Sequence, residues 1–181
     1  AGLLPPATCV SAWLDAQSTI PRRQRALNFQ EGMPSGPSML MLELEAKLIE
    51  IGKRYAAIGI HVSNAYASEQ ARLQLDLVLS SERLCSEEGT SESLAAIIRI
   101  AELTKAHKDA FQKILAAASS ENAAVLSALP DAEKSERLAK LAETLNRHLA
   151  SQSAFYCARD QWIDAATKIC DLVQSCRGTA V

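Results

Sequence analysis

Apolar residues recur at steps of three and four along the stretch from residue 38 to residue 85. This spacing places them on one face of an α-helix, and no proline interrupts the stretch. The sequence therefore predicts one long helix over residues 38–85, with Ser38 as its N-cap. The apolar stripe comprises Met41, Leu44, Leu48, Ile51, Tyr55, Ile58, Val62, Tyr66, Leu73, Leu77 and Leu84.

Two further helices are predicted by the same pattern, over residues 90–129 and 131–177. A short polar turn that contains Gly89 precedes the first of them. Pro130 separates the two, and proline is favoured in the first turn of a helix. Because both connections are short, neighbouring helices should run antiparallel.

Residues 1–37 form the N-terminal segment. Pro5 and Pro6 keep its start extended, a short helix carrying Cys9 and Trp13 follows, and a loop rich in glycine and proline spans residues 32–37. The predicted fold is all-α, with residues 1–181 in a single helical-bundle domain. We expect an elongated antiparallel three-helix bundle, with the short N-terminal helix packed as a partial fourth.

Composition supports closely packed helices. The chain is 48% hydrophobic but only 4% aromatic, so alanine and leucine must supply most of its core. Its net charge of −2, with acidic and basic residues interleaved, argues against a nucleic-acid surface. No apolar run approaches the roughly 20 residues of a membrane span. The sequence leaves room for an anchor outside this chain.

Five cysteines are many for a helical protein of this size. In the predicted antiparallel arrangement, Cys85 and Cys176 lie near the same end of the bundle, so we expect a disulfide between them, with Cys170 as the alternative partner of Cys85. Cys9 and Cys157 lie at similar heights and form the expected second bridge. The remaining cysteine, Cys170 in the preferred pairing, would be a buried thiol or an intermolecular bridge. The alternative is that all five are reduced core residues.

The compartment follows from the cysteines and from the start of the chain. No Cys-x-x-Cys or zinc-type spacing occurs, so disulfides are the favoured use of the cysteines. Disulfides persist in oxidising compartments, and a start at Ala1 without methionine fits removal of a leader or a trimmed chain. We therefore expect an extracellular, cell-surface or periplasmic protein. An organelle or an intracellular assembly is the alternative.

No pattern for catalysis, cofactor binding or metal binding emerges. His61, His107 and His148 lie at different predicted heights and do not converge. The sequence has no phosphate-binding loop, nucleophile elbow or haem-attachment motif. A bundle with two tight turns also offers few loops over a concave pocket. We therefore expect a protein that is not an enzyme and has no cofactor and no metal.

The predicted function is binding to a macromolecular partner, most simply a protein. Candidate contact residues are Trp13 and the basic cluster of Arg22, Arg23 and Arg25, although such a cluster is also typical of a solvated helix face. A cell-surface receptor ectodomain or an adhesin would use a bundle in this way. The alternatives are a structural subunit of a larger assembly, and a bundle that holds a small apolar ligand beside small residues such as Ala56 and Ala118.

Long alanine-rich helices joined by short turns are also a known type of ectodomain. In general build the predicted bundle is similar to the helical surface glycoproteins of trypanosomes and to periplasmic helical bundles of bacteria. This resemblance is one of architecture. It implies an all-α fold and a role outside the cytoplasm, and it carries over no site residues.

Overall fold

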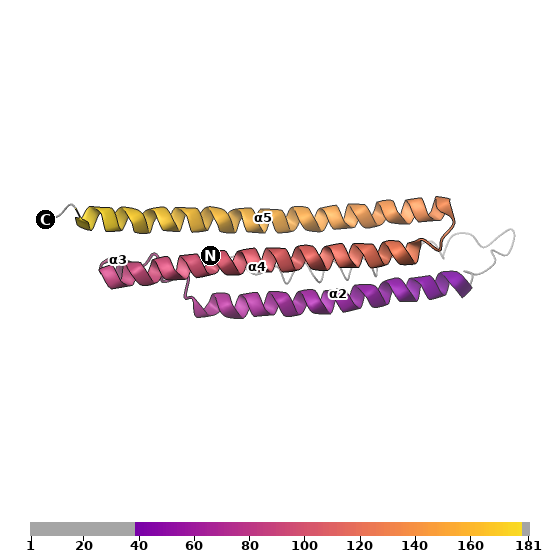
Figure 1. Ribbon diagram of the computed structural model, residues 1–181, viewed down its shortest axis with the longest axis horizontal. Helices are drawn as coiled ribbons and strands as arrows, with labels where there is room; N and C mark the ends of the chain where they lie inside the picture. The colour runs from indigo at the N-terminus through magenta and orange to yellow at the C-terminus, as the bar shows by residue number, and fades with distance from the viewer. Residues whose placement is uncertain (1–38, 179–181) are drawn as a thin grey trace, which may run out of the picture. The chain divides into compact units, whose positions relative to one another are not determined.

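The computed structural model describes residues 39–178, which form four α-helices and no strand (Figure 1). The predicted N-terminal segment and its short helix lie outside the described residues. The helices are α2 (Met39–Arg72), α3 (Ser81–Leu84), α4 (Glu87–Leu126) and α5 (Asp131–Gly178).

The contacts divide the chain into two compact units, and α2, α4 and α5 each contribute to both. Within the described residues, unit 1 contains residues 61–111 and 151–178, and unit 2 contains residues 39–60 and 112–150. In each unit α4 runs antiparallel to α2 and α5. Tyr66 contacts Thr104 and Thr90 contacts Arg177 in unit 1, whereas Arg54 contacts Glu121 in unit 2. The predicted all-α antiparallel packing is confirmed in each unit.

The core of unit 1 joins α4, α5 and the segment that follows α2. Val78 and Cys170 are fully buried there, and Trp162 packs against their cluster. Ala96 and Ala166 are also buried, which allows α4 and α5 to approach closely. The last turn of α5 is held by Arg177, whose guanidinium donates hydrogen bonds to the carbonyl of Leu84 and to the hydroxyl of Thr90.

The core of unit 2 is aliphatic. Leu44 of α2 packs with Leu126, the last residue of α4, and with Leu129, which follows α4. Leu138 and Leu141 of α5 pack against this cluster. A half-exposed ion pair between Glu45 and Arg137 joins α2 to α5, with 3.6 Å between the charged atoms. Pairs of this exposure contribute little to stability, so the leucine cluster is the main source of cohesion.

The long helix predicted over residues 38–85 is wrong in its last part, because α2 ends at Arg72. Residues 73–79 form successive turns instead, and Gln74 adopts a left-handed backbone with φ of 48°. Leucine occupies every second position from Leu73 to Leu79, so a helix would spread these side chains around its circumference. The turns instead bury Val78 completely and bring Leu75 and Leu79 against the same core.

The corner between α3 and α4 depends on Gly89. The polar turn predicted before residue 90 is the start of a helix instead, because α4 begins at Glu87 and Gly89 lies in its first turn. A Cβ atom at Gly89 would lie 2.3 Å from the carbonyl oxygen of Arg83 and 2.9 Å from its Cα. Both are backbone atoms that cannot rotate away, so the corner requires glycine.

The substitution Gly89→Ala should destabilise the protein. Alanine normally favours a helix by about 1 kcal/mol over glycine, but the clash with Arg83 should outweigh this gain and cost roughly 1–3 kcal/mol. The free energy of unfolding, measured with urea, tests this. Glu88→Ala, an exposed change in the same helical turn, is the control. A Gly89→Ala variant that is more stable than the parent would contradict the steric argument.

Candidate functional site

The structure corrects the predicted disulfide between Cys85 and Cys176. The sulfur atoms of Cys85, Cys157, Cys170 and Cys176 are not bonded to one another. The ends of α3 and α5 do come together, as the contact of Arg177 with Leu84 requires. Proximity of the helix ends does not suffice, because a disulfide also requires a specific separation and geometry of the two cysteines.

The thiol groups have other neighbours. Cys85 Sγ donates to the carbonyl oxygen of Glu82 on its own helical turn, at 3.0 Å. Cys157, the predicted partner of Cys9, accepts a hydrogen bond from Gln161 at 3.6 Å, and Cys9 lies outside the described residues. Cys170 is a buried thiol in the core of unit 1. Burial, with a smaller contribution from Asp171, raises the pKa of the Cys170 thiol, so it is a poor nucleophile.

A buried cluster of polar and aromatic side chains joins the three long helices in unit 1. His107 of α4 lies between Tyr66 of α2 and Tyr156 of α5, and its ring centroid is 4.5 Å from that of Tyr66. The hydroxyl of Tyr156 lies 2.8 Å from His107 Nδ1, and the hydroxyl of Tyr66 lies 3.1 Å from that of Thr104. Phe111 completes the surroundings of the imidazole.

The protonation of this cluster is set by burial. Burial lowers the pKa of His107 from its ordinary value to about 4 and, with a smaller contribution from Tyr66, raises the pKa of Tyr156. The imidazole is therefore neutral near pH 7. No protein group hydrogen-bonds its Nε2 atom. The neutral imidazole is packed among rings and forms a contact between the three long helices.

Arg159 extends the cluster by one helical turn of α5. Arg159 is 5% exposed, and its guanidinium donates to the side-chain oxygen of Gln70 at 2.9 Å and lies beside the rings of Phe155 and Trp162. The contacts that these atoms make are therefore with an amide oxygen and with two aromatic rings, which attract a cation.

Unit 2 contains a second polar contact, which is partly exposed. Arg54 forms an ion pair with Glu121, and the hydroxyl of Tyr55 donates to the other oxygen of Glu121 at 2.5 Å. The hydrogen bond to Glu121, followed by partial burial, raises the pKa of Tyr55. The contacts of Arg54 and Tyr55 with Glu121 join α2 to α4 in unit 2.

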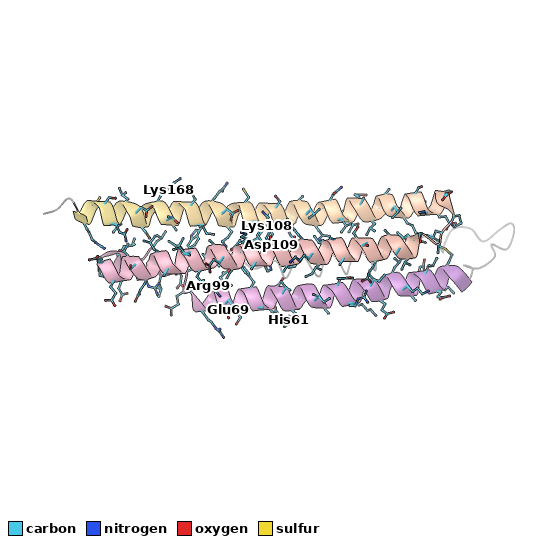
Figure 2. The ribbon with its side chains drawn as sticks, in the orientation of Figure 1. His61, Glu69, Arg99, Lys108, Asp109 and Lys168 are labelled. Atoms are coloured by element: carbon cyan, nitrogen blue, oxygen red, sulfur yellow. The ribbon has the colours of Figure 1, made fainter. Side chains whose placement is uncertain are left out.

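The arrangement of ionisable groups does not suggest metal binding. In the described part of the chain, no three side chains of histidine, cysteine, aspartate or glutamate are grouped as metal ligands would be. Of the three histidines, His61 is exposed on α2 (Figure 2). His107 is buried among rings. His148 is partly buried on α5, in unit 2. No helix within residues 39–178 is both long and apolar enough to cross a membrane.

The exposed surface of α2 carries an apolar stripe in unit 2. Leu42 is 54% exposed, and Ile49 and Ile60 are each 43% exposed. Successive residues of an α-helix are rotated by about 100° about its axis, so these three side chains leave α2 in directions that agree within about 20°. Ile58 is similarly exposed at 42% but lies on the opposite flank of α2. Sequence reasoning missed this second stripe because it sought one apolar face per helix.

The predicted contact residues Trp13, Arg22, Arg23 and Arg25 lie outside the described residues. The exposed stripe of α2 is therefore the candidate site that the structure offers in unit 2. The spacing of Leu42, Ile49 and Ile60 was a signal that could have revealed it. No protein-family model, curated protein or solved structure matches this chain.

Acidification should weaken folding because of His107. The folded ring has a lowered pKa, so the unfolded chain binds its proton first as the pH falls from about 6.5 towards 4. The free energy of unfolding should therefore decrease by up to roughly 3 kcal/mol as the pH falls from about 6.5 to about 4. The lowered pKa of His148, caused by burial and by Arg147, acts in the same direction. Urea unfolding at several pH values would measure the slope, which His107→Gln should reduce.

The control for this prediction is His61→Gln, because His61 is exposed. The comparison uses the slope with pH rather than the stability at one pH, since His107→Gln also leaves Tyr156 with an altered partner. An unchanged slope in His107→Gln, with or without a change in stability at pH 7, would show that the buried imidazole is not responsible.

Thiol labelling should distinguish Cys170 from Cys85 and Cys157. The sulfur of Cys170 is buried, whereas Cys85 and Cys157 are exposed thiols. An alkylating reagent applied to the native protein should modify Cys85 and Cys157 within minutes and Cys170 only after denaturation. Peptide mass spectrometry gives the extent of reaction at each position. Rapid modification of Cys170, or protection of Cys85 by a disulfide, would contradict the described packing.

Proposed function

We propose that this chain is a non-enzymatic binding protein that presents a helical surface to a macromolecular partner, most simply a protein. The observation that supports the proposal is the apolar stripe of Leu42, Ile49 and Ile60 on α2. Isolated exposed leucines are common on protein surfaces, but alignment of three along one helix is typical of a contact surface. The proposed site lies wholly within unit 2.

The stripe also carries one charge. Lys53 is exposed and, at about 100° per residue, lies within about 20° of Leu42 around the helix, between Ile49 and Ile60. A partner would therefore have to accommodate this ammonium group beside the aliphatic side chains. Burying each half-exposed leucine or isoleucine contributes roughly 1 kcal/mol. The stripe alone would therefore supply roughly 3 kcal/mol, and the partner must also contact neighbouring residues.

The proposal includes a role outside the cytoplasm, as a receptor ectodomain or an adhesin. That part rests on the number of cysteines and on the general build of the bundle. Because the four described cysteines are not joined to one another, the binding proposal does not depend on a bridge among them. The α2 surface is made of aliphatic side chains that would act in either redox environment.

A permanent subunit of a larger assembly is the second candidate function. It is favoured by exposed large apolar side chains in both units, including Leu149 at 44% in unit 2 and Ile98 at 61% in unit 1. Obligate interfaces are larger and more apolar than those of transient complexes. A permanent subunit would aggregate or lose stability when separated from its partner, whereas a transient binding protein would remain monodisperse.

A photo-activatable amino acid placed at Ile49 should capture a discrete partner protein in the cells that produce the chain. The same group at Ile58, equally exposed on the opposite flank, is the matched control. Leu42→Lys should reduce capture from position 49 at least tenfold, because a buried charge at the stripe is costly. Mass spectrometry of the cross-linked product identifies and quantifies the partner. Equal capture from positions 49 and 58, or none from position 49, would refute the proposed surface.

A further inference from the structure

The interior of unit 1 contains a basic side chain that is almost completely shielded from water. His107 is 4% exposed, and its imidazole packs against Tyr66 of α2, Phe111 of α4 and Tyr156 of α5. Histidine is the side chain whose ordinary pKa allows it to gain a charge between pH 8 and pH 5. A proton taken up by His107 would therefore place a positive charge between the three long helices.

The described groups that face His107 are neutral or positively charged. The titratable neighbour on α2 is Tyr66, and the one on α5 is Tyr156, whose hydroxyl lies 2.8 Å from Nδ1. Tyrosine hydroxyls are neutral at acidic pH. On α4 the ammonium group of Lys108 lies 5.8 Å from the centroid of the Tyr156 ring, and Arg159 of α5 is a second buried cation. Burial is the one cause of the lowered pKa of His107, so no carboxylate offsets a charge there.

The hydrogen bonds around His107 also suit a neutral ring better than a charged one. A neutral imidazole has one N–H group and one acceptor nitrogen, whereas a protonated imidazole has an N–H group at both positions. Tyr156 contacts Nδ1, and Nε2 is buried without a hydrogen-bond partner. After protonation Tyr156 can only accept, and Nε2 becomes a charged donor without an acceptor. Leaving such a group buried is costly, so protonation favours a state in which water reaches the ring.

Arg159 connects the surroundings of His107 to the apolar core of unit 1. Its guanidinium carbon lies 5.9 Å from the ring centroid of Phe155 and 5.9 Å from that of Trp162. Phe155 packs against Tyr66 and Tyr156, the same rings that contact His107, and Trp162 packs against the core cluster. Separation of the helices at His107 should therefore extend to Trp162, because the two places share this stack of side chains.

We propose that His107 is an acid-sensitive switch that opens unit 1 while unit 2 stays folded. Protonation favours a state in which the helices have separated around His107 and water surrounds the imidazole. The described core of unit 2 is the leucine cluster around Leu44, which contains no titratable group. Acid therefore acts on one cooperative part of the chain before it unfolds the whole, as local opening does in other proteins.

The size of the effect follows from the difference between the closed and open states. The pKa of His107 is about 4 in the closed state and about 6.5 in an open, hydrated state, so the open state binds the proton first as the pH falls. The ratio of open to closed molecules should rise on the order of a hundredfold between pH 7 and pH 4.2. In unit 2, burial and then Arg147 lower the pKa of His148, so His148→Gln removes this second group from the test.

Hydrogen exchange of the whole His148→Gln chain, measured by mass spectrometry at pH 7 and pH 4.2, tests the proposal. After correction for the chemical exchange rate at each pH, protection of the amides in residues 151–178 should fall on the order of a hundredfold. Protection in residues 131–150, which belong to unit 2, should change by less than about threefold. Adding His107→Phe, which keeps a ring but removes the titratable group, should abolish the difference between the units. Adding His61→Gln, at an exposed position, should leave it unchanged.

A second measurement needs no variant at position 107 and so holds even if His107→Phe does not fold. Nuclear magnetic resonance of chain labelled with ¹⁵N-histidine reports the protonation of each ring, and His107 should remain neutral at pH 5.5. Protonation of His107 at that pH with the protection of residues 151–178 intact would overturn the proposal. So would an equal loss of protection in both units, no loss in unit 1, or a loss that persists in His107→Phe.

This inference is independent of the surface proposed for a partner. That surface lies on α2 in unit 2, whereas the switch lies in unit 1. The exchange experiment involves no partner, and the cross-linking experiment involves no change of pH. Either proposal can therefore fail while the other stands.

Discussion

The packing of unit 1 depends on a short series of buried polar contacts between helices that otherwise offer few distinctive shapes. Alanine and leucine allow neighbouring helices to slide in register at little cost, because one layer resembles the next. The contacts of Tyr66 with Thr104 and of His107 with Tyr156 break this equivalence, since a shift of one turn would leave their buried polar atoms without partners. Arg159 and Gln70 act in the same way between α5 and α2. We regard this layer as the source of a single alignment rather than of extra stability.

Most of the helical content could be predicted from the spacing of apolar residues, because α4 and α5 have long stripes and are separated by Pro130. The position at which α2 ends could not be predicted in this way. Leu73 and Leu77 continue its stripe and favour a longer helix. Leu75 and Leu79 give the same segment an alternating pattern, which the stripe alone does not reveal. Burial of Val78 then favours turns over a continued helix. Whether residues 73–79 form turns or continue the helix depends on the surface that α4 and α5 present to them. The local sequence pattern does not contain that information.

The features that bear on function were harder to foresee. The predicted bridge followed from the heights of Cys85 and Cys176 along the bundle, but helix heights alone do not fix the separation and geometry that a disulfide requires. His107 follows Thr104 by three residues and precedes Phe111 by four, so its place in the buried stripe was visible in the sequence. The exposed stripe of α2 was visible too, as a second periodic pattern beside the core stripe. Only exposure values separate such a stripe from a core face.

The contacts of Arg177 have a mechanical consequence. This side chain holds the last turn of α5 to the end of α3 and the start of α4 through two hydrogen bonds from a charged group. A pulling force applied to the C-terminal end of α5 would load these bonds before it reached the apolar layers at Cys170 and Ala166. If the force peeled α5 away from α4, the helix would detach one turn at a time, beginning at Arg177. A force along the axis of α5 would instead strain many layers at once and meet greater resistance.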